Sequence, residues 1–364
     1  MSVLDRTGTV QPSIRPGRTG PTGSPGPTVT RVRRARRAPI HRRRAVVAAL
    51  SLVLVLTFSA RVLLGDFTFT IPDFFRILFG AEIPGASYIL METKLPRAVL
   101  AVLVGLAFGV GGAIFQTTLR NPLASPDIIG VSVGASAAAV FTIVTLGLDG
   151  PAVSVAAVVG AIGIAVLVRM VAGPSTGYRL VLIGVGMAAA LQSVIQYLFT
   201  RADEYDAQLV LRWLTGSVSG ATWPTIRLLA LLLLALLPAM FWLSRSLRVT
   251  ELGEETASGL GVPRSRTDAL LLLAVVLTAC GVAAAGPVAF VAFLAGPIAR
   301  ALNGGRSTLV GAGLTGAIIV VGADYIADYL LADINFPVGV VTGALGAPFL
   351  LWLLASGRTG RRAE

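Results

Sequence analysis

Residues 94–136 decide the fold, and they read KLPRAVLAVLVGLAFGVGGAIFQTTLRNPLASPDIIGVSVGAS. Between Ala98 and Leu119 the stretch has no charged residue, and about 20 mostly apolar residues in a helix cross the hydrocarbon core of a bilayer. The run is also rich in small residues, namely Gly105, Gly109, Gly111 and Gly112. Small residues let membrane helices approach closely. We therefore predict a membrane-spanning helix that packs tightly against its neighbours.

The same pattern extends along most of the chain, which is 55% hydrophobic and 13% charged, with a mean hydropathy of +0.81. This composition is too apolar for a soluble fold. Apolar runs separated by turn signals predict ten spans, near residues 45–64, 98–119, 128–148, 151–172, 180–199, 228–243, 269–285, 287–302, 308–327 and 337–354. The expected fold class is all-α transmembrane, with one membrane domain over residues 45–356.

Residues 269–302 could form one long span or two short ones broken at Gly286-Pro287. The basic residues favour two. Both chain ends are strongly basic, and basic segments stay on the cytoplasmic side, so the number of crossings must be even. Ten spans satisfy this rule, and we expect both termini in the cytoplasm.

The formal net charge of +12 is concentrated at the N-terminus. Eleven of the thirty basic residues precede Ala45, namely Arg6, Arg15, Arg18, Arg31, Arg33, Arg34, Arg36, Arg37, Arg42, Arg43 and Arg44. Their position next to a span makes them a topology signal, and we expect no binding to nucleic acid. Residues 1–44 are predicted to be a disordered cytoplasmic arm that contacts lipid head groups, and residues 357–364 a cytoplasmic tail.

Several kinds of chemistry are excluded by residue content. The single cysteine, Cys280, and the single histidine, His41, cannot form a disulfide framework, a thiolate metal cluster or a histidine metal site. No G-x-x-x-x-G-K-[ST] phosphate loop occurs, and the only lysine is Lys94. The chain cannot hydrolyse ATP by the P-loop mechanism, so we expect no enzyme site, no bound metal and no cofactor.

Several ordered motifs resemble the FecCD family of permeases from iron-siderophore, haem and vitamin B12 importers. The likeness covers nearly all of the chain after Ala45. The matching segments are Lys94-Leu95-Pro96-Arg97, Asn121-Pro122-Leu123-Ala124-Ser125-Pro126, Ile129-Gly130-Val131-Ser132, Trp213 with Gly216-Ser217, Leu252-Gly253 with Leu260-Gly261-Val262, and Pro337-Val338-Gly339 through Gly346-Ala347-Pro348.

The resemblance implies a type II ABC importer permease fold like that of the vitamin B12 permease, and import of ferric siderophores. The expected partners are a cytoplasmic P-loop ATPase dimer that uses the ATP, an identical or similar permease, an extracytoplasmic siderophore-binding lipoprotein and membrane lipid. Residues 251–266 are then the cytoplasmic turn that docks on the ATPase. The coupling residues would be Leu252, Gly253, Glu254, Ala257, Leu260, Gly261, Val262 and Arg264.

Other candidate residues have two open interpretations. The basic residues Arg76, Lys94 and Arg97, assigned to the outer side, either pair with acidic groups of the binding protein or pair within the chain. Residues of the second set either line a translocation path or serve helix packing, and they are Gly130, Gly134, Asn121, Pro122 and Asp324.

Asp324 and Asp328 lie one helical turn apart at membrane depth, where ionisable residues often mark transport pathways. A proton-coupled secondary transporter is therefore an alternative, although helix packing explains the pair more simply. A third alternative keeps the ABC machinery but carries haem or a cobalamin.

The chain departs from the family at three places. Asp328 stands where arginine is common, residues 296–300 stand where many members have Pro-His-x-x-Arg, and Asn335-Phe336-Pro337 replaces Glu-Leu-Pro. These differences leave open the siderophore class and whether the partner permease is identical.

Overall fold

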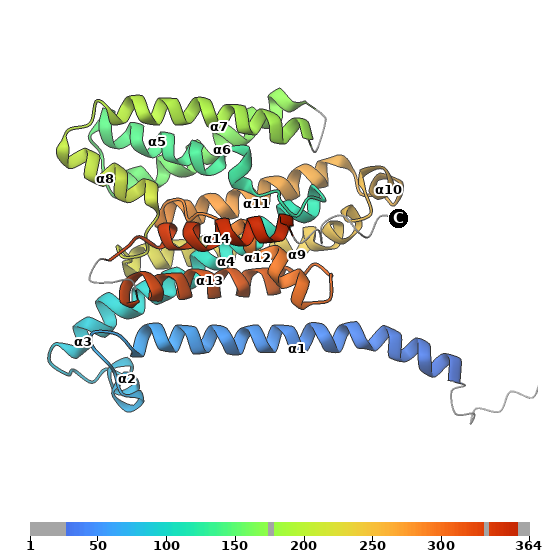
Figure 1. Ribbon diagram of the computed structural model, residues 1–364, viewed down its shortest axis with the longest axis horizontal. Coiled ribbons are helices and arrows are strands. Elements are labelled where there is room, and N and C mark those ends of the chain that lie inside the picture. The colour runs from blue at the N-terminus through green and yellow to red at the C-terminus, as the bar shows by residue number, and fades with distance from the viewer. Residues whose placement is uncertain (1–26, 174–177, 331–334, 356–364) are drawn as a thin grey trace, which may run out of the picture. The chain divides into compact units, whose positions relative to one another are not determined.

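The computed structural model describes residues 27–173, 178–330 and 335–355, and these residues form helices and connecting loops with no strand (Figure 1). This confirms the predicted all-helical fold. The chain divides into two compact units, Met1–Arg44 and Ala45–Glu364. The described part of the first unit is the beginning of α1 (Pro27–Leu63), and the second unit holds the rest of α1 and all later helices.

The helical start of α1 differs from the expected disordered arm, because residues 27–44 are helical; residues 1–26 lie outside the described part. The glycine, proline, serine and threonine that favoured disorder are concentrated before Arg31. From Arg31 onward arginine and alanine, both good helix formers, dominate. Extending an existing helix costs much less than nucleating one, so the first span can propagate back through them.

Each of the ten predicted spans is matched by one helix. These helices are α1, α4 (Leu95–Thr118), α5 (Val131–Leu146), α6 (Pro151–Ala172), α7 (Tyr178–Phe199), α9 (Trp223–Thr250), α11 (Arg264–Ala285), α12 (Val291–Leu302), α13 (Leu309–Tyr329) and α14 (Val338–Ala355). In the described residues seven helices are long and apolar enough to cross a membrane, and α5, α12 and α14 are apolar but shorter.

Short elements connect the spans. They are α2 (Ile71–Leu78), α3 (Ala86–Tyr88), the π-helix η1 (Ile89–Lys94), the 3-10 helix η2 (Pro126–Ile129), α8 (Glu204–Thr215) and α10 (Glu254–Gly259). α3, η1 and α4 follow one another without a break, so one helical run extends from Ala86 to Thr118.

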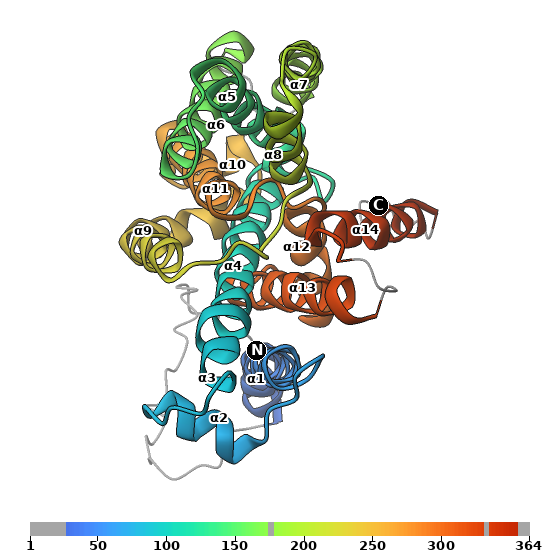
Figure 2. The same cartoon turned by 90° about the vertical axis from the view of Figure 1, so that its left-hand side faces the viewer.

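α4 is the central helix of the second unit and packs against α9, α11, α12 and α13 (Figure 2). Its glycines make this packing possible. A Cβ atom on Gly105 would clash with the backbone of Ala317 in α13, and one on Gly112 would clash with the backbone of Ala292 in α12. The prediction of a tightly packed, small-residue span is therefore confirmed.

The predicted break between α11 and α12 is also confirmed. α11 ends at Ala285 and is followed by Gly286 (φ 71°), and α12 begins after Phe290, whose φ of 63° is unusual for a bulky residue. Backbone groups of neighbouring segments are close: Ser217 N donates to Ala285 O at 2.7 Å, and Gly339 N donates to Gly216 O at 3.1 Å.

Candidate functional site

The segment Glu251–Arg266, which we name the coupling turn, lies between α9 and α11. It contains one short helix, α10, followed by the first residues of α11. Gly253 (φ 108°) and Gly261 (φ 82°) flank α10 with backbone angles that L side chains rarely adopt. Val262 N donates to Ala257 O at 2.9 Å and closes the turn after the helix. The glycines therefore set where the short helix begins and ends.

Some side chains of the coupling turn are buried, and others are exposed. Ala257 and Val262 are buried, at 2% and 8% exposure. Leu252 and Leu260 are 59% and 61% exposed. The turn is thus held by small apolar contacts while it presents two leucines to its surroundings.

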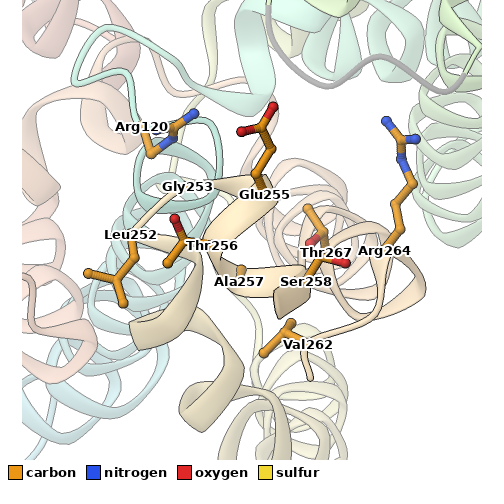
Figure 3. Close-up of a pocket in the computed structure, with 10 residues that line it drawn as sticks. All are labelled: Arg120, Leu252, Gly253, Glu255, Thr256, Ala257, Ser258, Val262, Arg264 and Thr267. Atoms are coloured by element: carbon orange, nitrogen blue, oxygen red, sulfur yellow. The ribbon is translucent and has the colours of Figure 1, made fainter. Parts of the chain in front are cut away.

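A cavity of about 840 Å³ lies beside α10 (Figure 3). Its lining residues are Arg120, Leu252, Gly253, Glu255, Thr256, Ala257, Ser258, Val262, Arg264 and Thr267. In Figure 3 the side chains of Arg120, Glu255 and Arg264 extend toward the same side of α10. The cavity therefore has a polar rim with charges of both signs and an apolar base.

Arg120 connects this cavity to the link between α4 and η2. Its own φ is 51°, and a Cβ on Gly253 would lie 3.1 Å from Arg120 Nη1. In the same link Asn121 Oδ1 accepts a hydrogen bond from Leu123 N at 2.9 Å, next to Pro122. The residues of this link therefore contribute to local backbone structure.

Seven of the eight predicted coupling residues can be placed with their side chains. Gly253, Ala257 and Val262 form the inner side of the turn, and Leu252, Leu260, Gly261 and Arg264 are exposed. Glu254 begins α10, but its side chain lies outside the described residues. Five of these residues, Leu252, Gly253, Ala257, Val262 and Arg264, line the cavity beside α10.

At the other end of α4 lies the charge cluster, which consists of Arg61, Arg97, Asp324 and Asp328. Arg61 bonds Asp324 at 2.6 Å and Asp328 at 3.0 Å. Arg97 bonds the same two carboxylates at 2.8 and 3.1 Å. Each guanidinium therefore bridges both aspartates, and two positive charges balance two negative ones.

The charge cluster is deeply buried and joins three spans. Arg61 and Asp324 are each 1% exposed, and they come from α1 and α13. Arg97 is on α4, so α1, α4 and α13 meet at these ion pairs. Charged groups at membrane depth are expected to pair in this way.

Lys94 extends the cluster toward the loop after α1. Its Nζ atom donates to Leu64 O at 2.6 Å and to Phe67 O at 2.5 Å. The side chain is 4% exposed and lies 5.5 Å from the ring centroid of Phe69. Lys94 thus fixes the backbone that leaves α1.

For Lys94 and Arg97 these contacts agree with the second interpretation, pairing within the chain, and not with docking. Lys94 and Arg97 are buried and bonded within the chain, so their charges are not available to a partner's carboxylates. The physical reason is that the helix begins at Ala86, so both residues lie inside a helical run instead of in a surface loop. Arg76 differs: its side chain is 73% exposed, and its contact with Asp73 is long, at 3.8 Å. Docking by Arg76 stays a prediction.

The contacts of Gly130, Gly134 and Asp324 agree with the packing interpretation. A Cβ on Gly134 in α5 would clash with Ile164 of α6, and a Cβ on Gly130 (φ 86°), which precedes α5, would lie 3.5 Å from the Cβ of Ala188 in α7. Asp324 is occupied by the ion pairs described above. None of these three contacts points to an open path.

Two important residues escaped prediction. Arg61 lies inside the apolar run 45–64, where an arginine signals that a buried counter-ion must exist elsewhere. Arg120 lies just after an apolar run and resembles an ordinary basic flank. The sequence contains a signal for the first residue and none for the second.

The similarity to known proteins extends over most of the chain. A model of the FecCD transport family matches residues 52–356. The chain belongs to the FecCD transport family. The ferric enterobactin permease FepG of Escherichia coli is 38% identical over 295 residues, which is 80% of this chain and 89% of FepG. The Fe(3+) dicitrate permease FecD of Escherichia coli is 38% identical over 272 residues, 73% of this chain and 85% of FecD.

Solved structures give the same result. A metal-chelate type ABC transporter in an inward-facing conformation superimposes on this FecCD family member with a TM-score of 0.76 at 25% identity, covering 86% of this chain and 99% of that one. PsaBC of Streptococcus pneumoniae shares the fold at a TM-score of 0.54 and 17% identity. The chain is therefore a multi-pass membrane permease subunit of the ABC importer class.

Proposed function

We propose that this FecCD family member imports ferric-siderophore complexes across the bacterial plasma membrane as one of two permease subunits. Its relatives are named for ferric enterobactin and Fe(3+) dicitrate, which are both chelates of ferric iron. Chelates of this kind are bulky and often charged. A path lined by small and apolar residues offers them room without strong binding, so affinity would reside in a separate extracytoplasmic binding lipoprotein.

The energy would come from a cytoplasmic P-loop ATPase dimer that binds the coupling turn. The observation that carries this proposal is the exposure of Leu252 and Leu260 on a turn whose ends are fixed by glycines and whose base is buried. A stiff apolar protrusion of this kind can enter a groove and transmit a displacement to α9 and α11. Closure of the ATPase pair on ATP would then switch the spans between outward and inward access.

The exposed leucines provide the test. Replacing Leu260 by aspartate places a charge on the proposed docking face, and stimulation of the ATPase by the reconstituted permease should fall at least tenfold. Leu330 is 63% exposed at the far end of α13, so Leu330→Asp is the matched control and should retain stimulation. Equal stimulation by both variants would exclude docking at the coupling turn.

We infer that the path lies between this chain and an identical or homologous permease. α7 supports this inference, because only 17% of its apolar 18-residue stretch is buried inside the protein. Its exposed surface includes Gln192, Ser193 and Gln196. Amide side chains on a span are costly in contact with lipid. A water-filled path or a protein partner would satisfy them.

Proton-driven transport is the alternative mechanism, and the charge cluster argues against it. A carboxylate that carries protons must be able to lose its charge at one stage of transport, whereas each aspartate here is bonded to two arginines. Uptake of a ferric siderophore in cells that lack the cognate ATPase separates the mechanisms, because it should vanish for an ABC importer and persist for a proton-coupled one.

Growth of cells on single iron sources tests which cargo the permease carries. Cells deleted for this chain should fail to grow on one class of ferric siderophore as sole iron source while still using other iron sources. Loss of growth on haem alone, or loss of cobalamin uptake, would instead assign one of those cargoes.

A further inference from the structure

Helix α2 is amphipathic in an unusual way, because only one of its two apolar faces is buried. Ile77 is 4% exposed and packs inward. The second apolar face is open and consists of Ile71 (62% exposed), Phe75 (48%), Leu78 (43%) and the adjoining Phe79 (84%). At about 100° per residue these four side chains fall on one arc of about 100°. We name this arc the α2 apolar face.

The polar residues of α2 point elsewhere. Asp73 and Arg76 lie outside the α2 apolar face, about 120° and about 60° around the helix from its nearest member, Phe79, and the Arg76 side chain is 73% exposed. Thr70 caps the helix by accepting a hydrogen bond from Asp73 N at 3.2 Å. The helix therefore separates an open apolar side from an open polar side, as helices at a membrane surface do.

The depth of α2 relative to the spans is fixed by several contacts. Ile77 belongs to a buried cluster with Val62 near the end of α1 and with Leu95 and Ala98 at the start of α4. Lys94 holds the carbonyl groups of Leu64 and Phe67 in the loop that leads into α2. α2 is consequently held at the level where two membrane-spanning helices end, which is the level of the lipid head groups.

The α2 apolar face also continues an exposed apolar surface of α1. Only 17% of the apolar 18-residue stretch of α1 is buried inside the protein, and its exposed side chains include Leu52, Val55 and Leu56. Leu64 and Phe67 in the following loop are 45% and 42% exposed and extend this surface toward α2. In Figure 2 α2 lies at the edge of the second unit, away from α5 and α7. An edge position next to a lipid-facing span favours lipid as the occupant.

We propose that α2 is an interfacial helix that inserts the α2 apolar face, led by Phe75 and Phe79, into the acyl-chain boundary of the adjacent leaflet. Arg76 then remains in the head-group layer, where it can meet lipid phosphate. The proposal depends on α1 and α4 being spans and is independent of cargo and of the ATPase. Its effect is to pin the charge cluster end of α1 and α4 to one membrane depth.

A single-cysteine experiment tests the insertion. Cys280 is buried, so Cys280→Ala provides a background in which Phe79→Cys and Arg76→Cys are labelled with the fluorophore NBD. Both chains are reconstituted in phosphatidylcholine and phosphatidylglycerol vesicles. Lipid carrying a doxyl quencher close to the glycerol backbone should quench the Phe79 label several-fold more than the Arg76 label, and a water-soluble quencher should show the reverse order.

A second labelled position guards against a local effect of removing Phe79. Ile71 lies on the same arc and is 62% exposed, so Ile71→Cys should behave like Phe79→Cys. If the labels at Ile71 and Phe79 are as open to the water-soluble quencher as the label at Arg76, lipid insertion is wrong and the face is free for a soluble protein. Loss of transport in any variant does not alter this readout, so the proposal and the transport function fail separately.

Discussion

The charge cluster depends most on Arg61, because this buried side chain has the least access to partners outside the cluster. It is 1% exposed and reaches Asp324, Asp328 and the hydroxyl group of Tyr329. Removing one member of a buried ion pair leaves an uncompensated charge, which costs more than the pair itself contributes.

Arg61→Met should therefore destabilise the protein by about 3 kcal/mol or more, measured by thermal unfolding in lipid nanodiscs. Arg76→Met is the control, since an exposed pair at 3.8 Å contributes at most about 1 kcal/mol.

The double variant Arg61→Met with Asp328→Asn restores charge balance between Arg97 and Asp324. It should recover part of the loss. If the double variant is as unstable as the sum of its single changes, the four residues do not act as one cluster.

Sequence reasoning at this scale found one half of the cluster. Asp324 and Asp328 were noticed because two carboxylates in an apolar run are conspicuous. Their partners were not found, because Arg61 is 263 positions from Asp324 along the chain and pairing across spans depends on packing that hydropathy does not contain. Lys94 and Arg97 were assigned to the wrong surroundings for the same reason.

Helix contacts are the next scale, and here α4 depends on glycine. A Cβ on Gly112 would clash with the backbone of Ala292, which cannot rotate away as a side chain can. By contrast, nothing lies within 4 Å of a Cβ on Gly163 in α6.

Gly112→Val should therefore cost about 1–3 kcal/mol of stability through overpacking, seen as a lower thermal midpoint and a poorer yield of monodisperse protein. Gly163→Val should leave both measurements nearly unchanged. Equal loss in both variants would mean that the effect of valine does not depend on the contact with α12.

α7 supports a second prediction at this scale. Gln192→Leu combined with Gln196→Leu should reduce uptake of ferric siderophore several-fold without lowering thermal stability, because the two side chains are exposed and make no contribution to the core. Val194→Leu, at another exposed position of the same helix, is the matched control. Unchanged uptake in the double variant would place the path elsewhere.

At the scale of the whole molecule, the positions of the spans along the chain could be predicted better than the contacts that each span makes. The ten helices follow from apolar length, and the break at Gly286 follows from glycine and proline chemistry. The cavity beside α10 could not be predicted, since it requires Arg120 to approach Gly253 from a distant part of the chain. Helical continuity at residues 27–44 was missed because composition describes a segment without its neighbours.

An even number of membrane crossings predicts which side of the membrane each loop of the permease faces. In the Cys280→Ala background, Leu260→Cys should react with a membrane-impermeant maleimide only in inside-out vesicles. Tyr88→Cys, at a residue that is 70% exposed before α4, should react only in intact cells. Reaction of both positions from the same side would contradict the odd number of crossings proposed between them.

The short length of α12 has a consequence for biogenesis. Its 12 residues extend about 18 Å, less than the hydrocarbon core, so the non-helical backbone of residues 287–289 reaches membrane depth. Lipid cannot solvate such a segment. α12 is therefore unable to partition into the bilayer alone, and during synthesis it must wait at the translocon until α4, α13 and finally α14 pack around it, which makes the last helix of the chain a requirement for completing insertion.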